Sequence, residues 1–208
     1  RMNVSLIPYI ILILMGAAWG LSIPLTKVTV STGYGQFGLI FWQFVIAAIV
    51  LGFVLVVRRK RPLFEQKTIF LFIVLALLGT IFPNSASYVA TYYLPASFIA
   101  ILIATVPMFS FPIAMLMGLE KKDFRRISGL FIGLLGVVIL TAPEASFPDR
   151  HLLIFIPLAL LAPFFYAIEG NYVDKYGTAG QDPIQTFTGA SILGTFMILP
   201  VTIFTGQW

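Results

Sequence analysis

Long apolar runs, separated by short polar or Gly- and Pro-containing stretches, dominate the pattern of this chain. Each run is about 20 residues long, which is the length that an α-helix needs to cross a hydrocarbon core of about 30 Å. None alternates apolar and polar residues as a membrane β-strand does. The pattern therefore predicts an all-α polytopic membrane bundle with seven spans, at about residues 5–30, 36–57, 68–92, 96–118, 127–142, 152–173 and 184–205.

Composition narrows the possible functions. The chain is 59% hydrophobic and 10% charged, whereas about a quarter of the residues in a soluble domain are charged. It has no cysteine and one histidine, His151, so we expect neither a disulfide framework nor a Cys- or His-built metal site. A GxxxxGK[ST] phosphate-binding motif is absent from the sequence. We expect no cofactor and no direct use of ATP.

The basic residues predict an orientation. All but two of the 13 lysines and arginines fall on one side of the predicted topology, mostly in segments 58–67 and 121–126; the exceptions are Lys27 and Arg150. By the positive-inside rule this side is cytoplasmic, so the N-terminus is inside and Trp208 is outside the cell (inner) membrane. The rule explains the basic runs without a nucleic-acid partner, and we expect the partners to be lipid and a small-molecule substrate.

An internal repeat is predicted by an offset of 147 residues, which places the first span on the sixth and the second on the seventh. The offset pairs Ser22 with Glu169, although few paired residues are identical. Because the paired spans run in opposite directions, the pattern is that of an inverted repeat around a central site.

Two stretches resemble EamA-type members of the drug/metabolite transporter superfamily. MGAAWGLSIPLTKV resembles the first helix of that family, and segment 95–140 is similar in its small and apolar residues, its proline, and Glu120 followed nine residues later by Gly129. The resemblance covers residues 6–141 and, weakly, the next two helices. It implies inverted five-helix repeats and ten helices in the complete protein. The domains implied are a first repeat at 1–147 and the start of the second at 148–208.

The chain also departs from that family. Family members often carry Arg in the second helix, where this chain has Trp42, Gln43 and Phe44. Asp123 and Arg126 replace a Thr and a Gln that are frequent after the exit glutamate. Asp123 is expected to cap the helix that follows, because its side chain can accept from free backbone N–H groups.

A polar stripe runs along the third span at helical spacing: Asn84, Ser87, Tyr88 and Thr91. Hydrogen-bonding groups are disfavoured against lipid, so we expect the stripe to face the bundle. It either contacts a substrate or forms hydrogen bonds between helices. The candidate substrate-binding residues are Trp19, Ser22, Asn84, Ser87, Tyr88, Tyr166 and Glu169.

Two charged residues inside spans have two interpretations each. Glu169 either is an interfacial carboxylate or binds an amino-bearing substrate or a proton; Lys27 either extends to the outer interface or has a role in the site. On the fifth span, Gly129, Gly133 and Gly136 share one face that allows a close helix approach. That face is expected to pack internally or to form a homodimer, and the helices missing from the second repeat are further expected partners.

The function predicted from these features is secondary transport of small metabolites such as amino acids, by alternating access. The family resemblance implies export more often than import. A seven-helix receptor is an alternative, but it requires the N-terminus outside. An intramembrane enzyme is the other, but the spans hold few groups suited to hydrolysis.

Overall fold

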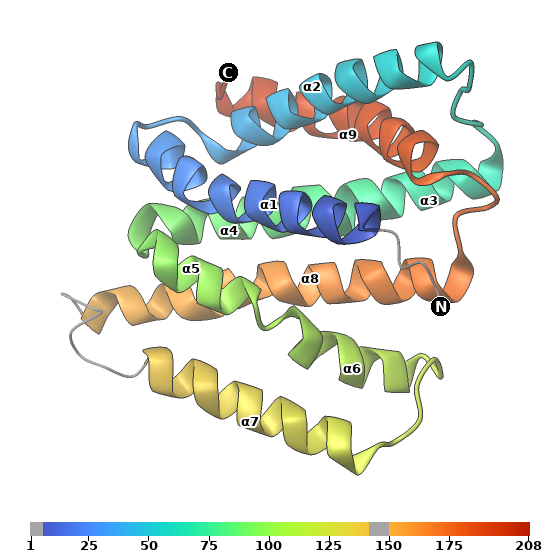
Figure 1. The fold of residues 1–208 in the computed structure, drawn as a ribbon. Helices are drawn as coiled ribbons and strands as arrows, with labels where there is room; N and C mark the ends of the chain where they lie inside the picture. The colour runs from blue at the N-terminus through green and yellow to red at the C-terminus, as the bar shows by residue number, and fades with distance from the viewer. Residues whose placement is uncertain (1–5, 142–149) are drawn as a thin grey trace.

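The computed structural model describes residues 6–141 and 150–208, and its regular structure there is entirely helical (Figure 1). The helical segments are α1 (Ile7–Ser31), α2 (Gln36–Val57), α3 (Gln66–Ala76), the π-helical turn η1 (Leu77–Ile81), α4 (Phe82–Tyr93), α5 (Ala96–Ile103), α6 (Val106–Leu116), α7 (Phe124–Thr141), the 3-10 helix η3 (Arg150–Ile154), α8 (Phe155–Tyr176) and α9 (Pro183–Thr205).

The predicted multi-pass bundle is confirmed. Within the described residues, six helical stretches are long and apolar enough to cross a membrane, and α7 occupies the place of the fifth predicted span. Arg1, the expected ends of spans at residues 5 and 142, and the expected repeat boundary at 147 lie outside the described residues. The repeat itself stays a prediction.

Two spans are interrupted where proline prevents a regular helix. The third span is one rod from Gln66 to Tyr93, in which η1 separates α3 from α4 just before Pro83. Proline has no N–H and its ring clashes with the carbonyl four residues earlier, here that of Gly79; a π turn relieves such a conflict. The fourth span breaks between α5 and α6, two residues before Pro107.

The connections define two ends of the bundle. Segments 58–65, 117–123 and 177–182 lie together at what we call the basic end, and segments 32–35 and 94–95 lie at the opposite, far end (Figure 1). Successive spans alternate in direction, so the described termini lie towards opposite ends. Within the bundle, α8 contacts α4, α5, α6 and η1, and α9 packs along α2 and α3.

Close approach of α9 to α2 depends on a glycine. An added Cβ at Gly194 would lie 2.5 Å from Cζ of Phe44, whose side chain is 4% exposed. Since an ordinary carbon contact is about 3.5–4.0 Å, only glycine fits against this ring.

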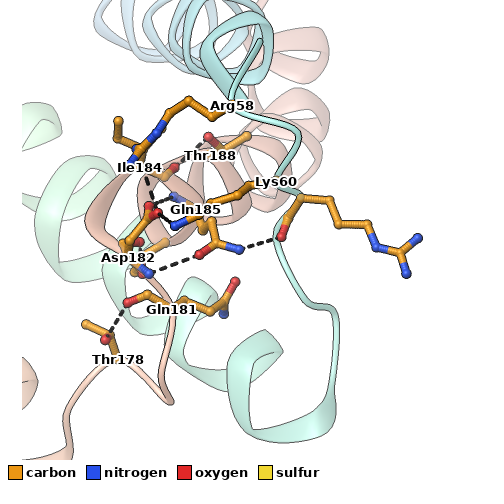
Figure 2. A network of polar contacts seen from close by, with 10 residues as sticks. Arg58, Lys60, Thr178, Gln181, Asp182, Ile184, Gln185 and Thr188 are labelled. Carbon is orange, nitrogen blue, oxygen red and sulfur yellow. Dashed lines mark hydrogen bonds and ion pairs between the residues drawn. The ribbon is translucent and has the colours of Figure 1, made fainter. Parts of the chain in front are cut away.

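A polar network joins the two connections at the basic end (Figure 2). Asp182 caps α9 by accepting from the Gln185 backbone N–H at 3.0 Å, and its Oδ2 lies 2.8 Å from Lys60 Nζ and 3.7 Å from Arg58 Nη1. The Gln185 side chain donates to the Arg61 carbonyl at 2.7 Å. The hydrogen bond from Lys60 first, and that from the Gln185 backbone next, lower the pKa of Asp182 below its usual 3.8. This network, which we call the Asp182 network, ties the start of α9 to the α2–α3 connection.

Candidate functional site

A cavity of about 540 Å³ lies among α1, α2, α4, α5 and α8, in the half of the bundle nearest the far end. Its position follows from the lining residues, which come from the second half of α1, the first half of α2, most of α4, and α5. Tyr166, near the middle of α8, also lines the cavity. The lining residues are Trp19, Ser22, Ile23, Leu25, Thr26, Thr29, Leu39, Trp42, Gln43, Ile46, Asn84, Ser87, Tyr88, Thr91, Ile99, Ile103 and Tyr166.

Six of the seven residues predicted as substrate contacts are brought together in this cavity. They are Trp19, Ser22, Asn84, Ser87, Tyr88 and Tyr166. The polar stripe of the third span faces the bundle interior, where Asn84, Ser87 and Thr91 are buried. The geometry thus supports a shared location for these six residues, and their contact with a substrate stays a prediction.

Hydrogen bonds link three helices across the cavity. Tyr166 on α8 donates to Asn84 Oδ1 on α4 at 3.0 Å. Asn84 Nδ2 donates to Gln43 Oε1 on α2 at 2.9 Å, and the Tyr88 hydroxyl donates to the same oxygen at 3.1 Å. We call these four side chains the amide relay. Asn84 and Tyr88 of the polar stripe thus form hydrogen bonds between helices, as one of its two interpretations predicted, and contact of the stripe with a substrate stays a prediction.

Gln43 is the member of the relay that was not among the sequence candidates. It is an amide within an otherwise apolar stretch, IFWQFVIAA, and its position had been noted only as a departure from the family pattern. A single polar residue in the middle of an apolar span is a signal that identifies such a residue, because an amide facing lipid is unfavourable.

The cavity carries no formal charge. Tyrosines are the only titratable residues in its lining, which otherwise consists of aliphatic side chains, hydroxyls, amides and two indoles. Trp19 and Trp42 are 56% and 49% exposed and line the wall contributed by α1 and α2. The site therefore combines apolar and aromatic surface with a few polar groups, as small-molecule pockets do.

Glu169 does not line the cavity. It lies on α8 three residues beyond Tyr166, towards the basic end, and packs against the π turn η1. A Cβ added at Gly79 would lie 2.6 Å from Glu169 Oε1 and 3.0 Å from Oε2. Because glycine has no side chain, it leaves room for this carboxylate. The side chain is partly buried, and no hydrogen bond or ion pair to it is found among the described residues. Glu169 faces a neighbouring helix and not the lipid surface.

Lys27 has a structural partner. Its Nζ donates to the carbonyls of Thr91 and Tyr92, each at 2.8 Å. These carbonyls lie in the last turn of α4, where no intrahelical donor is available. Lys27 therefore caps α4 at the far end.

Hydrogen bonds join α8 to α6 and the residue after it in the basic half of the bundle. The buried Asn171 donates from Nδ2 to the carbonyl and hydroxyl oxygens of Ser110, at 3.0 and 2.9 Å, and to the Ala167 carbonyl at 2.8 Å. Lys175 Nζ donates to the Met117 carbonyl at 2.8 Å. Neither Asn171 nor Lys175 lines the cavity.

The predicted features of the fourth and fifth spans are partly accounted for by local contacts. Asp123 caps α7, as predicted, by accepting from the Arg125 backbone N–H at 2.9 Å, and Glu120 forms an ion pair with Arg126 at 2.7 Å.

On the glycine face of α7, an added Cβ at Gly133 would lie 2.9 Å from Met108 Cε of α6, whereas Gly129 and Gly136 face no neighbour within 4 Å in the described residues. Internal packing thus explains Gly133 alone, and the homodimer stays a prediction.

Within the described residues no group of three or more His, Cys, Asp or Glu is placed to hold a metal ion.

Comparisons with known proteins agree with the helical bundle. A model of the EamA-like transporter family matches residues 6–142. The chain is 27% identical over 143 residues to an uncharacterized transporter, YdfC, of Bacillus subtilis (strain 168). That match covers 68% of this chain and 45% of the relative, so the chain spans less than half of the relative's length. No protein of known structure matches the chain.

Proposed function

The chain belongs to the EamA-like transporter family, and from this premise we propose that the protein is a secondary transporter that moves a small metabolite across the cell membrane by alternating access. The observation that carries the proposal is the uncharged, aromatic and amide-lined cavity between α1 and α8, two helices that run in opposite directions. Substrate sites of transporters with inverted repeats lie near the bilayer midplane at such a repeat interface.

The basic end is proposed to be cytoplasmic, because the loops 58–67 and 121–126 carry most of the lysines and arginines. The N-terminus is then inside and the membrane is the cell (inner) membrane. In this orientation the cavity occupies the outer half of the bundle. The α6–α8 contacts of Asn171 and Lys175 and the Asp182 network lie in the inner half. We infer that this conformation has its substrate site on the outer side.

An inverted repeat accounts for a second state. The proposed repeats are 1–147 and the beginning of another at 148–208, within a complete protein of ten helices. The antiparallel packing of α2 along α9, the two spans that the offset pairs, supports this assignment. The break between α5 and α6 and the π turn η1 provide points at which helices can bend as the inner half opens.

Amino acids and similar small amphipathic metabolites fit the cavity best. The cavity volume of about 540 Å³ lies within the usual range for small-molecule sites. Its indoles suit an apolar side chain, and its amides suit polar backbone groups. It offers no Lys or Arg to clamp a phosphate. Export is the proposed direction.

Glu169 is proposed to bind the substrate amino group or a proton on the inner side of the cavity. A partly buried carboxylate without an ion pair among the described residues is stabilised when it binds a cation or a proton, because a buried unpaired charge is unfavourable. Its place about one turn beyond Tyr166, towards the basic end, supports this proposal.

Transport by the complete chain in proteoliposomes tests the proposal. Vesicles loaded with a panel of radiolabelled amino acids should lose label faster than protein-free vesicles. Glu169→Gln keeps the shape of the side chain and removes its charge, so transport should fall and its dependence on pH should flatten. Glu120→Gln, at an exposed ion pair outside the cavity, is the matched control and should behave as wild type. Unchanged rates and pH profile in Glu169→Gln would make Glu169 a structural residue, and failure to move any amino acid would refute the substrate class.

A further inference from the structure

We propose that Gln43 is a specificity-determining residue of this cavity, and that its amide N–H group selects ligands that present a hydrogen-bond acceptor, a carboxylate above all. The inference rests on the proposed function, because it assumes that the cavity holds the transported ligand.

The oxygen of Gln43 is already occupied. Its Oε1 accepts from Asn84 Nδ2 at 2.9 Å and from the Tyr88 hydroxyl at 3.1 Å. An amide oxygen has two lone pairs, so these two donors saturate it. The Gln43 Nε2 group has two hydrogens and no partner among the described residues, and the side chain is exposed where it lines the cavity. The group that Gln43 offers to a ligand is therefore a donor.

The rest of the amide relay holds this orientation. Tyr166 donates to Asn84 Oδ1 at 3.0 Å, which turns the Asn84 amide nitrogen towards Gln43. If the Gln43 amide alone were reversed, two NH₂ groups would face each other and the Tyr88 hydroxyl would lose its acceptor. In the observed arrangement Tyr166, Asn84 and Tyr88 are all hydrogen-bonded while Gln43 presents its N–H group to the cavity.

A donor in a cavity without formal charge discriminates between ligand charges. A hydrogen bond from an amide to a carboxylate is charge-assisted and stronger than one between neutral groups. A ligand that brings only an ammonium group gains no hydrogen bond from Gln43 and meets another donor. Sites built to form a specific hydrogen bond reject ligands that lack the matching group.

Gln43→Glu is the decisive variant. One carboxylate oxygen still accepts from Asn84 and Tyr88, while the other replaces the Nε2 donor by a negatively charged acceptor. The probes are three leucine derivatives that differ in charge: N-acetyl-leucine, an anion; N-acetyl-leucinamide, which is neutral; and leucinamide, mostly a cation at pH 7. Their binding to the purified, full-length protein is followed through tryptophan fluorescence, since Trp19 and Trp42 line the cavity.

Wild-type protein should bind N-acetyl-leucine more tightly than leucinamide, and Gln43→Glu should shift the ratio of the two dissociation constants at least about tenfold towards leucinamide, because like charges repel and opposite charges attract. Gln43→Leu removes the donor without adding charge, so it should weaken binding of N-acetyl-leucine most. Gln36→Glu adds the same charge at the first residue of α2, about 10 Å away along the helix. This control should leave the ratio as in wild type.

The outcomes separate this inference from the proposed function. If wild-type protein transports amino acids but Gln43→Glu leaves the ratio unchanged, or if none of the three probes binds, the inference is overturned and the transport function stands. An equal shift in Gln36→Glu also overturns it, because the effect would then come from charge at the cavity mouth. If wild-type protein transports no amino acid and binds no probe, both fail together.

Discussion

Replacing Asn84 by leucine removes the central link of the amide relay. Asn84 is 7% exposed, donates to Gln43 and accepts from Tyr166. Leucine fills a similar place but makes neither bond, so the Tyr166 hydroxyl loses its acceptor and the Gln43 oxygen keeps only Tyr88. Hydrogen bonds between membrane helices contribute about 0.6 kcal/mol each on average, and a buried group left unpaired costs about 1–3 kcal/mol. We expect Asn84→Leu to lower the free energy of unfolding by about 1–3 kcal/mol.

The same substitution should weaken substrate binding. Without Asn84 the Gln43 amide is held by Tyr88 alone and is less well oriented. A loss of about 1.4 kcal/mol in binding corresponds to a tenfold rise in KM. KM and Vmax are measured in proteoliposomes that contain equal amounts of inserted protein, and unfolding is followed in detergent. We expect normal insertion, a KM raised about tenfold, and a modest loss of stability.

Asn171→Leu is the matched control for Asn84→Leu. Asn171 is a buried asparagine on α8 that donates to Ser110 and to the Ala167 carbonyl, outside the cavity. Its replacement should cost comparable stability and should leave KM unchanged. The reasoning is refuted if Asn84→Leu keeps the wild-type KM, or if both variants raise KM equally, since the relay would then be packing alone.

Two further predictions concern stability. Gly194→Ala should destabilise the protein by roughly 1–2 kcal/mol, because overpacking against the buried Phe44 ring outweighs the gain in helix propensity; Gly170→Ala, which meets no atom within 4 Å, should be neutral or stabilising in the same thermal-unfolding assay. Asp182→Asn keeps a capping side chain but loses the ion pair with Lys60. Because the pKa of Asp182 is lowered in the folded state, the wild type should be more stable than Asp182→Asn above about pH 4, and the difference should vanish as the pH falls through that lowered pKa. A difference that persists at pH 2 would contradict this assignment.

The sequence predicts the spans well because their length and apolar character are local properties imposed by the bilayer. Each of the seven predicted spans corresponds to one or two helices whose ends lie within a few residues of the expected bounds where the structure describes them. The polar stripe of the third span was also predictable, since helical spacing alone places Asn84 and Thr91 on one face. The cap by Asp123 depends on residues that are neighbours in sequence, so it could be predicted as well.

Only the tertiary structure decides which of these polar groups meet. Gln43 joins the relay because its partners, 41 and 45 residues away, lie on a helix whose rotation and register no local pattern specifies. The same applies to Lys27, whose acceptors lie at the end of α4. Glu169 shares a helical face with Tyr166, yet it packs against Gly79 and not in the cavity. The reason is that α8 contacts the π turn η1 at the position of Glu169. Apolar runs specify that helices cross the membrane, whereas the contacts between the helices depend on how side chains of distant segments fit together.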